Sequence, residues 1–418
     1  MKKFDFNFRL ILISKTISVF GGNILGFAMI LFLVDFTESA LLLGIVMAVS
    51  QIPTLFLAPF AGMIADRMDK KKLIVFFDVL TAISNFYFLW LLATESYTIL
   101  NITVLRMIKM SIVAFARTAF TAAVPQVVEE EQLLSANGAL QSIGAVGFIG
   151  GSVVGGILLD VLGIQMIAFA SGSMFLVSAG LSMLIKIPRL QMEDVGGMFQ
   201  TVKSDMIESF KFLKNEKPAL LKITLVGSVI TFLLPPIFMV GLPFIVEVIL
   251  GQEVTLSFAI AAIGMLAGGI LTGRLEKYLA IQHFGKLVGV LGGTGLFLAL
   301  AFSPLLSEQL IAFWIFNIAL AFLLFMLALT NSSLGAFIQK EVPEHLLGKV
   351  NALFDIISLI AGPLGMLAVG FLIETVELSL FFLGTTAIIW IAAALHHVIL
   401  KKYLEKNDEV HHHEKEEV

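Results

Sequence analysis

Residues 62–73 read Gly-Met-Ile-Ala-Asp-Arg-Met-Asp-Lys-Lys-Lys-Leu and lie between two long apolar stretches. Positions 67–72 alone carry four of the protein's 27 basic residues. A short basic connection between two apolar segments is typical of a turn that joins two membrane helices on the cytosolic side. The stretch therefore predicts a cytosolic turn between two transmembrane helices.

The rest of the chain has the composition of a membrane protein. Of its 418 residues, 58% are hydrophobic and 14% are charged, and the mean hydropathy is +0.97. A soluble domain carries about 25% charged residues. A soluble protein is therefore excluded. The absence of cysteine also excludes disulfides, thiol nucleophiles and cysteine metal sites.

Twelve apolar stretches are long enough to cross a bilayer, which takes about 20 apolar residues in a helix. They show no strand-like alternation, and only helices or closed barrels satisfy their backbone in lipid. We read the first as a transmembrane helix rather than a removed signal, because no small-residue cleavage site follows it. The stretches are roughly 10–34, 41–64, 73–94, 98–121, 136–159, 164–186, 219–246, 254–274, 286–304, 309–332, 350–373 and 379–400.

The distribution of charge predicts the orientation of these helices. With both termini in the cytosol, the outer connections contain nine acids and no Lys or Arg. Every basic residue except Arg106 and Lys109 then falls on the inner side, as the positive-inside rule requires. The nine acids are Asp35, Glu38, Glu95, Asp160, Glu247, Glu253, Glu308, Glu374 and Glu377.

The longest connection divides the chain into two six-helix halves, 1–186 and 219–402. The linker 187–218 carries apolar residues spaced by three and four, with charged residues between them, which predicts an amphipathic helix. Residues 403–418 form an acidic, histidine-bearing segment, for which we expect a disordered cytosolic tail. The halves repeat weakly: Gly151, Gly156 and Asp160 recur as Gly365, Gly370 and Glu374 at an offset of 214. Parallel six-helix repeats are a transporter architecture.

The basic turn resembles the signature loop of the major facilitator superfamily, a Gly-x-Leu-Ala-Asp-Arg-x-Gly-Arg-Arg pattern between helices 2 and 3. The matching residues are Gly62, Ala65, Asp66, Arg67, Lys70 and Lys71. Asp69 stands where the family has a glycine.

A second match lies in the fifth stretch and is similar to the antiporter signature of that superfamily. The glycine spacing agrees throughout, but Ser152 stands where proline is usual. Small residues at these intervals allow close helix packing. The glycines are Gly138, Gly147, Gly151, Gly155 and Gly156.

The resemblance covers essentially the whole chain and is greatest to bacterial drug-efflux proteins of the macrolide and enterobactin type. It implies an all-α membrane protein with twelve transmembrane helices in two pseudo-symmetric halves. It also implies proton-coupled export of lipophilic or amphipathic drugs, such as macrolides, by alternating access. The alternatives are export of a native metabolite (a siderophore or lysolipid), uptake of a solute, or a non-transporting sensor with the same fold.

Two buried cations are the first functional candidates, because an ionised group costs at least ~2.5 kcal/mol in the bilayer core. Arg106 and Lys109 lie on one face of the fourth stretch, roughly 12–17 Å from its outer end at 1.5 Å per residue. Arg106 resembles the helix-4 arginine that the superfamily associates with proton coupling. The alternative is a structural charge held by backbone carbonyls. The nearest N-terminal acid candidate, Asp35, lies closer to the outer surface.

Two further groups of charges lie nearer the cytosolic side. Asp78 and Arg117 are each about a turn from the inner end of their helices. With Asp66 and Arg67 they would form a cluster that latches the outward-open state, or a static stabilising cluster. Asp355 is a lone acid in the eleventh stretch. It would be either a proton site or a helix-end anchor paired with Lys349.

No cofactor is expected, because no phosphate-binding glycine loop, nucleophile constellation or metal motif is present outside the histidine tail. The chain is therefore not predicted to be an enzyme or an ATP-driven pump. Its expected partners are a lipophilic small molecule, protons and the lipid bilayer. No nucleic acid is expected. We predict a monomer in the bacterial cytoplasmic membrane.

Overall fold

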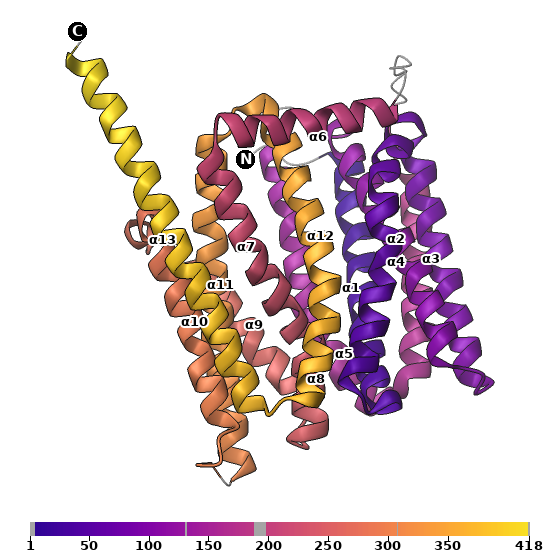
Figure 1. The fold of residues 1–418 in the computed structure, drawn as a ribbon. Helices are drawn as coiled ribbons and strands as arrows, with labels where there is room; N and C mark the ends of the chain where they lie inside the picture. Colours follow the sequence, from indigo (N-terminus) through magenta and orange to yellow (C-terminus); the bar gives the residue numbers. More distant parts are fainter. Residues whose placement is uncertain (1–4, 130–131, 188–197, 307, 417–418) are drawn as a thin grey trace. The chain divides into compact units, whose positions relative to one another are not determined.

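The protein is helical throughout the part that the structure, a computed structural model, describes (Figure 1). That part comprises residues 5–129, 132–187, 198–306 and 308–416. Within it, only the backbone is described for 58–59, 62–63, 65–67, 134, 198–203, 205, 344–345 and 406–416. No strand occurs among the described residues, which agrees with the all-helical prediction.

Eleven helical segments of the described residues are long and apolar enough to span a membrane, and one of them accounts for two predicted spans. This is α5 (Leu133–Leu184), which contains Gly163 with φ 74° and ψ 163°. A residue with a side chain rarely adopts that φ, so glycine allows the chain to turn there. The twelve predicted stretches are therefore all present as helix.

Contacts with α1 (Phe6–Thr37) show that the two parts of α5 run in opposite directions. Before Gly163, residue numbers increase in the same direction along both helices: Gly147 lies against Val19, and Gly151 against Asn23. After Gly163, residue numbers decrease along α5 as they increase along α1: Ser178 donates to the Ser14 carbonyl, and Ser171 donates to that of Gly21. The segment is thus two antiparallel helices that both pack on α1.

The chain divides into two compact units. Unit 1 comprises residues 1–38 and 45–198, and unit 2 comprises 39–44 and 199–418. Besides α1 and α5, unit 1 contains most of α2 (Ala40–Arg67), together with α3 (Lys70–Ala93) and α4 (Ile99–Ala123). In unit 1, α5 also packs against α3, and α3 packs against α4. One end of unit 1 has an apolar core in which Phe8, Ile74 and Phe120 are buried.

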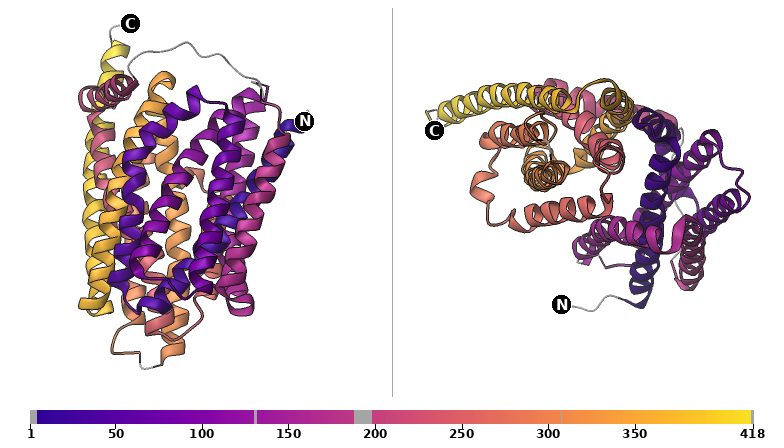
Figure 2. Two further views of the ribbon diagram at one scale, coloured as in Figure 1. Left: turned by 90° about the vertical axis from the view of Figure 1, so that its right-hand side faces the viewer. Right: turned by 90° about the horizontal axis from the view of Figure 1, so that it is seen from below.

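Unit 2 is built from the remaining helices, and its long helices α7 and α9–α13 run side by side in two orthogonal views (Figure 2). Its main packing pairs are α7 with α12, α9 with α11, and α10 with both α11 and α13. The bounds are α6 (Met198–Asn215), α7 (Pro218–Pro236), α8 (Leu242–Phe244), α9 (Val254–Leu271), α10 (Phe284–Ala301), α11 (Gln309–Glu341), α12 (Glu344–Thr375) and α13 (Leu378–Glu416).

At its prolines, the helix of the seventh span changes to wider π-helical turns and is not interrupted. Pro235 and Pro236 close α7, and two π-helical turns, Ile237–Gly241 and Ile245–Ile249, flank α8, which contains Pro243. Proline lacks a backbone N–H and obstructs the preceding carbonyl, so the local hydrogen-bond pattern must change. The helix therefore continues through its prolines with widened π-helical turns.

Polar contacts tie the helices of unit 2 together near the start of α7. Glu208 on α6 pairs with Lys349 on α12 at 2.7 Å. Lys217 pairs with Glu341 at 2.7 Å, and Tyr403 on α13 donates to the same carboxylate. Partial burial lowers the pKa of Lys217, but its hydrogen bond to Glu341 and the charges around it raise that pKa above the usual value. Lys217 therefore stays protonated.

The C-terminal segment differs from the prediction of a disordered tail. The backbone of α13 continues as helix through 403–416. Lys401 lies 3.8 Å from Glu405 one turn later, and such i,i+4 pairs stabilise a helix modestly. The histidines 411–413, whose composition allows a metal-binding use, fall where only the backbone is described.

The backbone of α12 comes close to that of α7 at Gly365. A Cβ built on Gly365 would lie 1.9 Å from the carbonyl oxygen of Phe232, whereas one on Gly362 would meet nothing within 4 Å. We expect Gly365→Ala to destabilise the protein by about 1–3 kcal/mol, because the two backbones must separate. Thermal unfolding in detergent should show a lower Tm for Gly365→Ala and an unchanged or higher one for Gly362→Ala. Equal Tm values would contradict this packing.

Candidate functional site

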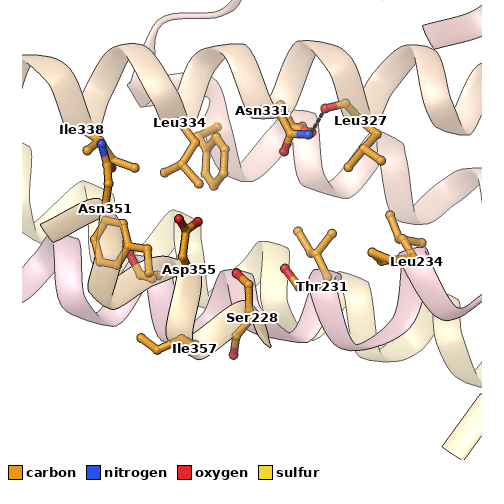
Figure 3. A pocket seen from close by; sticks show the side chains of 18 residues that line it. Ser228, Thr231, Leu234, Leu327, Asn331, Leu334, Ile338, Asn351, Asp355 and Ile357 are labelled. Atoms are coloured by element: carbon orange, nitrogen blue, oxygen red, sulfur yellow. Dashed lines mark hydrogen bonds between the residues drawn. The ribbon is translucent and has the colours of Figure 1, made fainter. Parts of the chain in front are cut away.

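A cavity of about 360 Å³ among the described residues of unit 2 is the candidate site (Figure 3). It is enclosed mainly by α7, α11 and α12. Most of its surface is apolar, which is typical of a small-molecule site with a few placed polar groups. The lining residues are Thr224, Gly227, Ser228, Ile230, Thr231, Leu234, Pro235, Phe284, Leu327, Thr330, Asn331, Leu334, Ile338, Asn351, Phe354, Asp355, Ile357 and Ser358.

Asp355 is the single ionisable side chain in that lining. Its carboxylate points into the space between α12 and α11, toward Leu334 and Asn331 (Figure 3). No hydrogen bond joins it to the other side chains drawn there. The sequence left open an anchor formed with Lys349, but Lys349 instead pairs with Glu208. Asp355 therefore presents its charge to the cavity.

The two cations of α4 lie inside unit 1. Arg106 is 8% exposed, and its Nη2 lies 2.8 Å from the sulfur of Met47 on α2. A thioether is only a weak acceptor, and Nε of Arg106 has no partner. Lys109, one turn further along α4, is half-buried. Neither cation forms an ion pair with a described acid.

Asp78 lies in a polar layer that the sequence did not predict. It is 2% exposed and accepts a 2.7 Å hydrogen bond from Ser178 on α5. Lys15 on α1 is near enough for its charge to act on Asp78, and its Nζ lies 4.3 Å from the centre of the Phe120 ring. Arg117, the partner expected from the sequence, is exposed. The structure thus groups Asp78 with Lys15 and Ser178.

A second polar layer lies seven residues away from the first on each helix. Asn85 on α3 donates to Ser171 at 3.0 Å, and Ser171 donates to the Gly21 carbonyl at 2.7 Å. The second layer lies seven residues later on α1 and α3 and seven residues earlier on α5. Seven residues are about two helical turns, so both layers lie on the facing sides of these three helices. A lysine at position 15 inside an apolar span was the sequence signal for this arrangement.

The basic turn places its residues at the end of α2 and the start of α3. Gly62, Asp66 and Arg67 belong to α2, but their side chains lie outside the described ones. Lys70 is buried and Lys71 is half-buried. Asp69, which replaces the family's glycine, caps α3 by accepting from the Lys72 N–H at 3.2 Å. Its φ of −61° needs no glycine.

The glycine series on α5 lies along α1. A Cβ on Gly147, Gly151 or Gly155 would come within 2.3–2.8 Å of α1 atoms. Gly156 is buried, and Gly138 has nothing within 4 Å. Ser152 donates to the Phe148 carbonyl at 2.7 Å within the helix. Three of these glycines therefore permit the close approach of α5 to α1.

The remaining candidate acid, Asp35, is exposed two residues before α1 ends. In the part of the chain that the structure describes, it forms no ion pair with Arg106 or Lys109. Among the described residues, no group of three His, Cys, Asp or Glu side chains is arranged to hold a metal ion.

Comparison with known proteins identifies the family. The model of the Major Facilitator Superfamily matches residues 11–366, which is most of the chain. The chain belongs to that superfamily of transporters. It is similar to macrolide efflux protein A of Streptococcus pyogenes, with 24% identity over 385 residues, covering 90% of this chain and 92% of the relative. It is also 24% identical to macrolide efflux protein A of Enterococcus faecalis over 321 residues, covering 75% of this chain and 96% of the relative.

Solved structures show the same fold. The nucleoside transporter NupG superimposes with a TM-score of 0.70 at 14% identity, covering 94% of this chain and 99% of that one. A bacterial homologue of the human lysosomal transporter Spinster, inward-facing and unoccupied, gives 0.70 at 15% identity, covering 96% and 97%. The protein is therefore a multi-pass membrane transporter with the twelve-helix, two-half fold of this superfamily.

Proposed function

We propose that this protein exports lipophilic or amphipathic compounds, such as macrolides, from the bacterial cytoplasm. The observation that carries the proposal is the cavity of unit 2, which is mainly apolar and contains one carboxylate and several neutral polar groups. Such a lining suits a hydrophobic ligand with few polar atoms. Two relatives that cover most of the chain are named as macrolide efflux proteins, which supports the same substrate class.

The transport cycle that we propose is proton-coupled alternating access in the cytoplasmic membrane, with both chain termini in the cytosol. The substrate site opens in turn to each side of the membrane, and protons flowing inward drive the exit of substrate. Arg106 and Lys109 are the proposed coupling group of unit 1, since neither pairs with a described acid and a charge in the bilayer core is costly unless it has a function. Asp355 is the proposed polar contact of the substrate in unit 2.

The basic turn is the proposed cytosolic latch of the outward-open state, formed through Asp66, Arg67 and their neighbours. We expect Asp66→Asn to abolish transport without reducing insertion, because the carboxylate can no longer pair with the surrounding cations. Export should be measured beside the amount of protein in the membrane. Full export by Asp66→Asn would rule out the latch.

Everted membrane vesicles test the function directly. Vesicles that contain the protein should accumulate a lipophilic fluorescent dye or a macrolide when the membrane is energised, and a protonophore should abolish the accumulation. Vesicles without the protein provide the background. Good expression with no flux for any compound in a broad panel would contradict the proposal and would favour a sensor with a transporter fold.

A further inference from the structure

We propose that the cavity of unit 2 is selective for organic cations, and that Asp355 is the counter-charge of a protonated amine. This inference rests on the proposed export function and narrows its substrate to lipophilic amines. It makes Asp355 a specificity-determining residue rather than a helix-end anchor.

The net charge of the lining is the first argument. Of the 18 residues around the cavity, Asp355 alone is ionisable, and no Lys, Arg or His is among them. The nearest lysine along α12 is Lys349, whose amine is 2.7 Å from Glu208. An anionic ligand would meet the carboxylate with no compensating cation in the lining, whereas a cation would gain an ion pair. The sign of the charge thus favours a cation.

The hydrogen-bonding state of the hydroxyl groups is the second argument. Thr224 donates its proton to the Leu220 carbonyl, Ser228 to that of Leu225, and Thr330 to that of Met326 or Leu327. A hydroxyl whose proton is used within its own helix offers only oxygen lone pairs to a ligand. These three oxygens and the Asp355 carboxylate therefore act as acceptors, while the amides of Asn331 and Asn351 and the hydroxyls of Thr231 and Ser358 in the same lining can accept or donate. Acceptors bind ligands that bring N–H donors, such as an ammonium group.

The shape and composition of the cavity give the third argument. About 360 Å³ is near the lower limit for drug-sized ligands, so the cavity fits a compact cation or the amine-bearing part of a larger molecule. Apolar residues from α7, α11 and α12, including Leu234, Leu334 and Ile357, provide the surface for its hydrocarbon part (Figure 3). A strongly hydrated cation such as an inorganic ion gains nothing from this surface. The ligand class is therefore lipophilic and cationic.

Two probes of nearly the same size and shape but opposite charge test the proposal. Tetraphenylphosphonium is a lipophilic cation and tetraphenylborate a lipophilic anion. Binding of each to the purified full-length protein in detergent is measured by equilibrium dialysis. We expect the wild type to bind the phosphonium more tightly than the borate. Asp355→Asn should weaken phosphonium binding about tenfold or more, because a charged partner is lost. Borate binding should not weaken.

Three further variants separate charge from folding. Asp355→Glu keeps the carboxylate and should bind the phosphonium within a few-fold of wild type. Asp355→Asn combined with Asn331→Asp moves the carboxylate to the facing helix of the same cavity and should recover part of the affinity. Glu253→Gln removes one exposed acid of unit 2 outside the cavity and should bind as the wild type does. The Tm of each variant is measured in the same detergent.

The outcomes distinguish this inference from the export function. Phosphonium binding unchanged in Asp355→Asn, equal weakening for both ions, or no binding of either ion by the wild type would overturn the proposed cation site. If Asp355→Asn does not fold, the test rests on Asp355→Glu. A folded Asp355→Glu that does not bind the phosphonium would also overturn the proposed cation site. If the wild type binds the cation through Asp355 but exports nothing, the export function fails while the cation site stands.

Discussion

Arg106→Met is expected to raise the thermal stability of the protein while abolishing its transport. Arg106 is 8% exposed, its Nε has no hydrogen-bond partner, and its one hydrogen bond among the described residues is to a thioether sulfur. Replacing even a buried ion pair with apolar residues of similar volume is often neutral or stabilising by about 1–4 kcal/mol, and a buried charge without an ionic partner has more to gain. Methionine keeps most of the side chain's length and removes the charge. Stability and export should therefore change in opposite directions.

The measurement pairs the Tm in detergent with dye export at matched expression. Arg106→Lys keeps the charge and is the control: its Tm should stay near that of the wild type, and some export should remain. A lower Tm for Arg106→Met would show that the arginine stabilises the fold, as the structural alternative holds. Full export by Arg106→Met would remove Arg106 from the transport mechanism.

Asp78→Leu is expected to produce a large loss of stability in unit 1. Its carboxylate is buried, accepts a hydrogen bond from Ser178 and is near the charge of Lys15. Removing it leaves a lysine inside the protein without its nearest counter-charge and a serine without its shorter hydrogen bond. The cost should be on the order of 2–3 kcal/mol. Thermal unfolding of the purified variant measures it.

A double-mutant cycle assigns that cost to the pair. Lys15→Met combined with Asp78→Leu should recover much of the stability that Asp78→Leu loses, because no uncompensated charge remains. Asp160→Asn removes an exposed acid from the same unit and should leave the Tm unchanged. Purely additive effects of the two substitutions would show that Lys15 and Asp78 act independently.

The number of spans and the family followed from the sequence, because apolar length and the positions of basic residues are local properties. The fifth and sixth spans were predicted separately, and the φ of Gly163 shows where they turn. Asp69 illustrates the limit of a motif. It departs from the signature, yet it caps α3, which needs an acceptor at that position rather than a glycine.

Partners within the site were less accessible to sequence reasoning. Asp78 was paired with Arg117 because both lie at similar depth on consecutive helices. The structure instead brings Asp78 together with Ser178, 100 residues away, through the packing of α3 on α5. Asp355 was identified as a lone acid. Whether it is a proton site or a helix-end anchor depended on whether Lys349 pairs with it. The tertiary contact of Lys349 with Glu208 is not encoded in the local pattern.

The most direct test of proton-coupled export uses the purified protein in liposomes, where no other transporter can contribute. With the protein's proposed cytosolic side outward, a pH gradient that is acidic inside should drive uptake of a lipophilic compound into the liposomes. The account predicts uptake that requires the gradient and stops when a protonophore collapses it. Uptake of the same extent without a gradient, or no uptake with one, would contradict it.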